Sequence, residues 1–370
     1  MNNSLDESLF DFENNLVNVS NAILKHYGCP SFHRPHQGIS SLLKGHSKIA
    51  VFLFDGLGES VLLAHKRAAK PFLSRSLFPL YSVNPATTVA ATTAFLTGKY
   101  PIETGYLGWS LYFDEWDFPV DVFPNENSLT GEKLVLDNYM EKVSPIKKLD
   151  VLLKENGVSA RLLFPFPIDR NGPKTLEEEF LEADAFFRKG GEFLYFYSPE
   201  PDHTLHEEGL PSKNVSRFIE KTARLLRQFA SRNPDVLTLS LSDHGMTNVI
   251  CRDLAAYPDL VDCLQKPLTF EGRTVNFFLK KEKSDDFEKA FRKRFESFVL
   301  LKREEILSSH YFGLGEPSKK ALSFLGDFVA LSKEDDFLGN SLDKPNRIIK
   351  GHHAGIRPEE RKILLCKWDM

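Results

Sequence analysis

Acidic residues follow three apolar runs of the sequence that have the length and composition of buried strands. IAVFLF is followed by Asp55, LTLSLS by Asp243 and His244, and EFLYFYSPEP by Asp202, with His206 four residues later. A fourth segment, GHHAG at 351–355, precedes the last apolar run. Because the carboxyl ends of parallel strands lie along one edge of a sheet, we expect these side chains to converge there.

Such a cluster has chemical consequences. Three carboxylates in one cleft repel one another and would shift toward their neutral forms unless a cation compensates them. Divalent metals supply that compensation, and mixed Asp and His ligands suit zinc or a similar transition ion. Each piece alone has a simpler interpretation, such as a turn at Asp55 or exposed loop residues at Asp202 and His206. Together they predict a metal site.

A second chemical element is the segment NPATTVAATTAFLTGKYP at 84–101. Its proline, threonines and small residues predict a loop that opens a helix, whose N-terminus favours anions. Thr87 or Thr88 could cap this helix. A hydroxyl held next to a metal could instead lose its proton and act as a nucleophile. The pattern leaves both interpretations open, and proximity to the metal edge favours the second for one threonine.

The elements that must position these residues alternate along the chain. Strand-like runs are expected at 49–55, 160–166, 192–198, 236–243 and 361–368, and helices at 147–156, 174–189 and 212–232. This alternation predicts an α/β fold with a mostly parallel central sheet and helices on both faces. The stretch 251–347 differs, with an expected strand at 273–280, a helix at 284–298 and a strand pair at 321–332. We expect a smaller α+β insertion or cap there, built into a core formed by residues 1–250 and 348–370.

Composition excludes several classes of protein. The chain has 370 residues, 42% hydrophobic and 26% charged, as expected for one large globular domain or two ordinary ones. Its net charge of −4 gives no electrostatic case for a nucleic acid polymer as partner. The four cysteines form no CxxC pair, and no apolar run has the length of a signal peptide core or a membrane span. These features predict a cytoplasmic protein without a membrane partner, and they do not indicate an oligomeric state.

The motifs, taken in order, resemble the alkaline phosphatase superfamily, and within it the type I phosphodiesterase and nucleotide pyrophosphatase family. The matching segments are FDGLG, PATT…TAFLTGKYP…TG, PEPDHTLH, SDHGM and GHHAGIRPEE, between about residues 49 and 370. The resemblance implies two divalent metal ions, most plausibly zinc. One would lie on Asp202, His206 and His353, and the other on Asp55, Asp243 and His244. Thr88 would be the nucleophile and would touch both metals, and the neighbours His203 and His352 are not expected to be ligands.

The implied activity is hydrolysis of phosphodiester or pyrophosphate bonds in a small phosphate ester, through a phospho-threonine intermediate. One departure concerns the substrate. Where the family carries an asparagine that donates to the phosphate, this chain has Trp109, and Thr104-Gly105 stands where the family usually has His-Gly. Trp109 could stack on a base or line a leaving-group pocket, or it could pack beneath the cap. The resemblance therefore does not by itself imply a nucleotide.

Other functions remain to be compared with this one. The same site could cleave a phosphomonoester, a phosphonate or a sulfate, although sulfatases of the superfamily use a modified Cys or Ser where this chain has Thr88. A binding protein with a vestigial site is a further alternative. A dinucleotide-cofactor enzyme is not supported, because DGLGES lacks the third glycine, at Val61, and no P-loop occurs.

Overall fold

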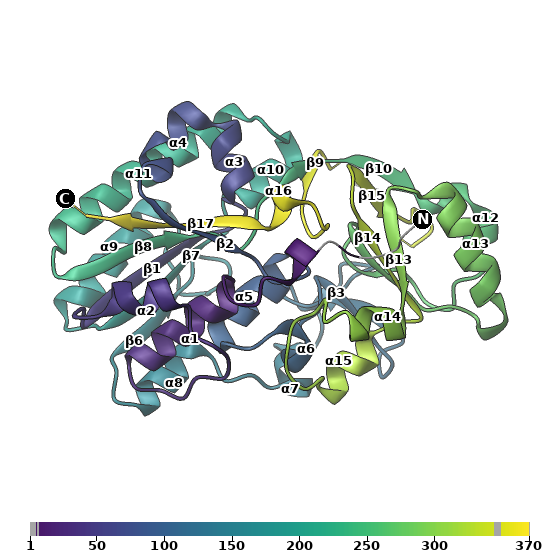
Figure 1. Ribbon diagram of the computed structural model, residues 1–370, viewed down its shortest axis with the longest axis horizontal. Coiled ribbons are helices and arrows are strands. Elements are labelled where there is room, and N and C mark those ends of the chain that lie inside the picture. The colour runs from purple at the N-terminus through teal and green to yellow at the C-terminus, as the bar shows by residue number, and fades with distance from the viewer. Residues whose placement is uncertain (1–4, 6, 344–348, 370) are drawn as a thin grey trace.

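The computed structural model describes residues 5, 7–343 and 349–369 and shows a mixed α/β fold with two main sheets (Figure 1). The larger sheet has the strand order β2-β17-β8-β1-β7-β6. Its strands are β1 (Lys48–Phe54), β2 (Ser76–Tyr81), β6 (Ala160–Leu163), β7 (Phe193–Ser198), β8 (Val236–Leu241) and β17 (Lys362–Trp368). β1 pairs in parallel with β7 and β8, and β6 with β7, whereas β17 is antiparallel to both β8 and β2.

Strand β1 is apolar on both faces because both faces of the sheet are covered by helices. Ile49, Val51 and Leu53 belong to one core cluster, together with residues of α1 (Leu16–His26), α5 (Thr88–Thr97) and α8 (Leu149–Glu155). Ala50, Phe52 and Phe54 belong to a second cluster, with α4 (Lys66–Leu73), α9 (Leu176–Arg188) and α11 (Lys213–Arg232). The two helical layers therefore fix the central strand, and with it the edge where Asp55 follows.

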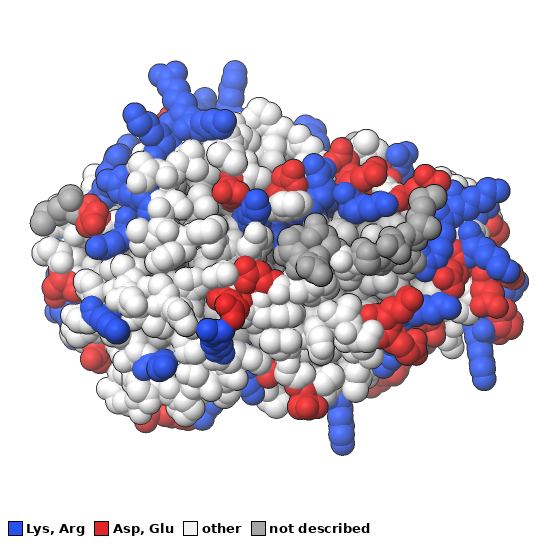
Figure 2. Space-filling model, viewed as in Figure 1, with Lys and Arg blue, Asp and Glu red and all other residues white. Residues whose placement is uncertain are grey.

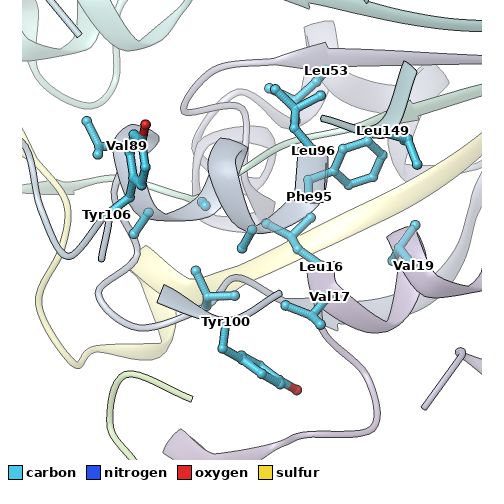
Figure 3. Packing of buried hydrophobic residues seen from close by; sticks show 14 of the residues in the cluster. Leu16, Val17, Val19, Leu53, Val89, Phe95, Leu96, Tyr100, Tyr106 and Leu149 are labelled. Carbon is cyan, nitrogen blue, oxygen red and sulfur yellow. The ribbon is translucent and has the colours of Figure 1, made fainter. Parts of the chain in front are cut away.

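Helix α5 is buried along its whole length. Figure 3 shows Val89, Phe95 and Leu96 of this helix among core side chains that include Leu16 and Leu53. The helix ends at Gly98, whose φ of 67° is the left-handed conformation common after a helix. Packing on all sides holds the beginning of α5 in one place beside the sheet.

The smaller sheet, at the right of Figure 1, is antiparallel throughout and has the order β13-β14-β12-β11-β3-β4-β5. Its strands are β3 (Ser110–Phe113), β4 (Phe118–Asp121), β5 (Glu126–Asn127), β11 (Thr269–Phe270), β12 (Thr274–Phe277), β13 (Phe298–Lys302) and β14 (Phe328–Ser332). Helix α13 (Ser284–Arg294) packs on this sheet through Phe287 and Phe291, which contact Phe277.

The remaining elements are short and connect the two sheets or cover their edges. They are η1 (Glu7–Phe10), α2 (Gln37–Leu43), α3 (Glu59–Ala64), α6 (Pro101–Thr104), α7 (Tyr139–Val143), α10 (Asp202–Glu208), β9 (Thr247–Asn248), β10 (Ile250–Asp253), η2 (Leu254–Ala256), α12 (Pro258–Val261), η3 (Lys281–Lys283), α14 (Arg303–Ser308), α15 (Lys319–Phe324), β15 (Asp336–Gly339), β16 (Gly351–His352) and α16 (Pro358–Arg361). None of the described helices combines the length and apolar character that a membrane span requires.

The prediction of an α/β fold is confirmed, and each of the five expected core strands is present. The prediction of a mostly parallel sheet is correct only in part, because β17 runs against its neighbours and the smaller sheet is antiparallel. The strand pair expected at 321–332 is wrong in its first half, where α15 forms instead. Ser318 caps that helix by accepting a hydrogen bond from Ala321 N, and Ala321 and Phe324 bury one face.

The domain division at about residue 250 stays a prediction, and its 347/348 boundary lies outside the described residues. The smaller sheet takes strands from two separate parts of the chain, since β3, β4 and β5 join strands that begin at Thr269.

Positive charge on the visible face gathers over the outer helices, above the larger sheet (Figure 2). Helices α4 and α11 pack against each other and expose eight cations. These are Lys66, Arg67, Lys70, Lys213, Arg217, Arg224, Arg227 and Arg232. These cations lie on helices, whereas the acidic residues of the predicted metal site follow the ends of strands.

Candidate active site

The side chains that follow the strands of the larger sheet converge at one edge. Two sets of residues each bring one ligand atom per residue to within 4.8 Å of one another. They are Asp202, His206 and His353, and Asp55, Asp202 and His244. The second set differs from the expected one, in which Asp243 accompanies Asp55 and His244. Asp243 is nevertheless adjacent, because its Oδ2 lies 3.5 Å from His244 Nε2, which is 3.2 Å from Asp55 Oδ1.

Strand order explains this convergence. Asp55 directly follows β1, and the neighbouring strands β7 and β8 lead into Asp202 and Asp243. Backbone bonds hold the three ends together: Asp202 N donates to Asp55 O at 3.1 Å, and Gly56 N donates to Asp243 Oδ1 at 3.1 Å. Gly56 has a φ of 69°, and a Cβ there would lie 3.0 Å from Asp202 Cβ. The close approach of these segments therefore requires glycine.

Each of the three histidines is oriented by a backbone carbonyl. The Nδ1 atoms lie 2.8 Å from Gly351 O for His206, 3.0 Å from Gly245 O for His244 and 3.1 Å from Ala86 O for His353. A carbonyl oxygen only accepts, so in the neutral imidazole Nδ1 carries the proton and the Nε2 lone pair is left for a metal ion at the acidic cluster. This is how histidines that bind metals are usually held.

Two carboxylate oxygens in the cluster are buried and have no hydrogen-bond partner among the described residues: Asp202 Oδ1 and Asp243 Oδ2. Buried acceptors without a donor are uncommon, because desolvation costs free energy that a hydrogen bond normally offsets. A cation on each of these oxygens would supply the missing interaction. The donor set of carboxylates and neutral imidazoles thus fits divalent metal ions.

The charges within the cluster lead to the same conclusion. Burial, together with the nearby Asp55 carboxylate, raises the pKa of Asp243 well above its usual range. Burial opposes protonation of His244, but Asp243 and Asp55 outweigh it and raise the pKa of this imidazole to about 10. Without a metal, the cluster therefore retains protons to balance its carboxylates.

Thr88 is the threonine that faces this cluster. Its Oγ1 lies 3.3 Å from Asp55 Oδ1, to which it donates, and 3.3 Å from His244 Nε2. Thr87 is the N-cap residue of α5, but its side chain makes no capping hydrogen bond and donates instead to Glu271. The sequence leaves open which threonine meets the metal edge, and the geometry brings Thr88 there.

Trp109 does not join the cluster through its side chain. The ring is partly buried and lies edge-on to Phe123, with centroids 6.4 Å apart. Its backbone N–H, however, donates to Glu271 Oε1 at 3.1 Å. Trp109 is thus linked to the beginning of α5 through Glu271, which also accepts from Thr87.

Two residues at the site have no signal in the sequence. Tyr197, within β7, donates its hydroxyl hydrogen to Asp55 Oδ2. Glu271 lies between two strands of the smaller sheet, 184 positions from Thr87. His352, which we did not expect to be a ligand, places its ring 4.7 Å from that of His206, and His203 is exposed.

Comparisons with known proteins agree with this arrangement. The model of the type I phosphodiesterase / nucleotide pyrophosphatase family matches residues 49–355, more than half of the chain. The chain belongs to this family and is a hydrolase of phosphodiester bonds. No curated protein matches the chain.

Solved structures share the fold. Murine ectonucleotide pyrophosphatase/phosphodiesterase 5, as an inactive variant in complex with AMP, is 17% identical with a TM-score of 0.66 over 88% of each chain. A second structure of the murine protein is 17% identical with a TM-score of 0.65, covering 87% of this chain and 88% of that one. The human protein is 14% identical with a TM-score of 0.64, and the match covers 87% of this chain and 88% of that one.

Proposed function

We propose that the protein hydrolyses phosphodiester or pyrophosphate bonds of small molecules, with Thr88 as the nucleophile beside two divalent metal ions. The observation that carries this proposal is the position of Thr88 Oγ1, 3.3 Å from both Asp55 Oδ1 and His244 Nε2. A hydroxyl so placed has an acceptor for its proton and stands among the residues that fit a metal.

Asp202, His206 and His353 would hold one metal ion, and Asp55, Asp243 and His244 the other. Zinc suits such mixed nitrogen and oxygen donors. Bound metal ions supply charge that neutralises the carboxylates, lowers the pKa of a nearby hydroxyl and stabilises the phosphoryl group during transfer.

The protein residues act in two steps. In the first, Thr88 Oγ1 loses its proton and forms a bond to phosphorus, and the leaving alcohol or phosphate departs with a proton. The resulting phospho-threonine still carries the other ester group of the substrate. Asp55 Oδ1 accepts the hydrogen bond of the hydroxyl and so orients an oxygen lone pair toward the substrate. In the second step, water displaces Thr88 from phosphorus, which releases the product and restores the hydroxyl.

The N-terminus of α5 supports anion binding at the same place. The Thr87 side chain does not cap the helix, so the first N–H groups of α5 stay available to phosphate oxygens. The murine neighbour in complex with AMP makes a small nucleotide a reasonable ligand to test. A cytoplasmic location stays a prediction from the sequence.

Substitution of the two threonines tests this proposal. Thr88→Ala is expected to abolish hydrolysis of bis-p-nitrophenyl phosphate while metal content and the unfolding midpoint stay at wild-type values. Thr87→Ala is the matched control and is expected to retain turnover, because its hydroxyl bonds Glu271 and makes no hydrogen bond with Asp55 or His244. Near-wild-type activity of Thr88→Ala would contradict the proposed nucleophile.

A further inference from the structure

Glu271 brings an acidic group from the smaller sheet to the edge of the metal site. It lies in the turn between β11 and β12, where its backbone N–H donates to Thr274 O at 2.9 Å. The next residue, Gly272, packs so closely that a Cβ would lie 2.2 Å from the Phe337 ring. The turn is therefore held from both sides, and Glu271 is fixed in its position.

The Glu271 carboxylate contacts the residue that precedes the nucleophile in the chain. Its Oε1 accepts a hydrogen bond from the hydroxyl of Thr87, which directly precedes Thr88, and another from Trp109 N–H. The residue as a whole is partly exposed, whereas its carboxylate is desolvated. The charge of His206, a proposed metal ligand, also acts on Glu271, so a phosphoryl group bound at Thr88 Oγ1 would lie within electrostatic range of this carboxylate.

Of the described side chains, the imidazole of His206 is the cation that acts on this carboxylate. Its hydrogen bonds come from Thr87 and Trp109, and neither Lys nor Arg forms an ion pair with it. Burial raises the pKa of Glu271 to about 7, the two hydrogen bonds and the charge of His206 oppose that rise, and Asp121 adds to it. Beside the nucleophile, the described part of the chain thus presents the Glu271 carboxylate without a Lys or Arg partner.

We propose that Glu271 is a specificity-determining residue that makes the site selective for phosphodiesters over phosphomonoesters, an inference that rests on the proposed function. A diester carries one negative charge, whereas a monoester carries a second one above its pKa of about 6. A nearby carboxylate repels the additional charge, and this repulsion is stronger in a partly desolvated site than in water.

The variant Glu271→Gln separates charge from position, because the amide oxygen can still accept from Thr87 and Trp109. At about pH 9 the Glu271 carboxylate of the wild type is ionised, and the monoester carries its second negative charge. We expect the ratio of kcat/KM for p-nitrophenyl phosphate to that for bis-p-nitrophenyl phosphate to rise about tenfold in this variant. An unchanged ratio, even with both activities lowered, would overturn the inference and leave Glu271 a purely structural role.

Glu103→Gln is a matched control. This glutamate also accepts a backbone N–H, from Tyr100 at 2.8 Å, and contacts a second side chain, His33. It lies in α6, beyond the other end of α5 from Thr88, at a distance of about 15 Å along the helix. We expect the ratio of the two activities to stay at the wild-type value, and an equal rise in this variant would also overturn the inference.

Binding of inorganic phosphate gives a measurement that is independent of turnover. Calorimetric titration of the zinc-loaded protein at about pH 9 is expected to show about tenfold tighter phosphate binding by Glu271→Gln than by wild type. Unchanged phosphate affinity would contradict the role of Glu271. Absence of diester hydrolysis by the wild type would contradict the proposed function instead, and the titration would still decide the charge effect.

Discussion

Arg273 and Glu360 form a fully buried, two-point ion pair, with Arg273 Nε 2.7 Å from Oε1 and Nη2 2.8 Å from Oε2 of Glu360. Glu360 Oε1 also accepts from Gly355 N–H at 2.7 Å. Next to Arg273, Thr274 Oγ1 donates to Ala354 O at 2.5 Å. The smaller sheet therefore holds the segment that contains His353.

This pair supports a strained backbone. Ala354, directly after His353, has a φ of 79°, which a residue with a Cβ adopts only when its surroundings enforce it. Both bonds hold the peptide group that follows Ala354, whose carbonyl accepts from Thr274 and whose N–H, of Gly355, donates to Glu360. We infer that they fix the direction in which His353 presents Nε2.

Glu360→Gln is expected to destabilise the protein by about 3–5 kcal/mol, because it leaves the Arg273 charge buried without its partner. The measurement is urea unfolding, together with zinc content after dialysis, which we expect to fall because His353 loses its support. Glu155→Gln, in the exposed pair with Lys147, is the control and should change stability by less than about 1 kcal/mol. Equal effects of the two substitutions would show that the buried pair has no special role.

Removal of individual ligands tests the metal assignment. Asp202 is proposed as a ligand of one metal ion, but its carboxylate also lies within 4.8 Å of ligand atoms of Asp55 and His244, whereas His206 belongs to one set only. We therefore expect His206→Ala to lose about one zinc ion per chain by elemental analysis, and Asp202→Ala to weaken binding of both. His203→Ala, on the same helix but exposed, is the control and should keep the wild-type content. Full zinc occupancy in His206→Ala would contradict the assignment.

Stability should depend on pH through Glu179. Burial raises the pKa of this glutamate to about 8, and its Oε2 has no hydrogen-bond partner among the described residues. The unfolded chain releases the proton near pH 4.3, about the usual value, whereas the folded protein keeps it to about pH 8. Since the folded state then binds more protons, this group lowers stability as the pH rises through that window, by about 1.4 kcal/mol per pH unit.

Glu179→Gln removes this contribution. We expect its urea midpoint to exceed that of wild type at about pH 8, and the difference to shrink toward about pH 4.3. Other titrating groups are common to both proteins, so the difference between them isolates Glu179. A difference that is constant with pH would mean that Glu179 titrates normally in the folded protein.

The sequence is sufficient to predict the larger sheet and the residues at its edge. Strands covered on both faces are continuous apolar runs, as in β1, and the acidic residue that ends such a run is conspicuous. The sequence does not predict that β3 joins the smaller sheet, because such pairing depends on contacts between distant segments. Glu271 and Tyr197 are missed for the same reason, since neither has a local pattern. Helix α15 is missed because its six residues are too few to show a helical period.

The stereochemical course at phosphorus tests the central role of Thr88 most directly. The substrate would be a phosphodiester made chiral by one sulfur atom, hydrolysed by the zinc-loaded wild-type protein in isotopically labelled water. Two successive displacements, first by Thr88 and then by water, each invert the configuration, so we predict net retention. Net inversion would mean that water attacks the substrate directly, and it would contradict a phospho-threonine intermediate.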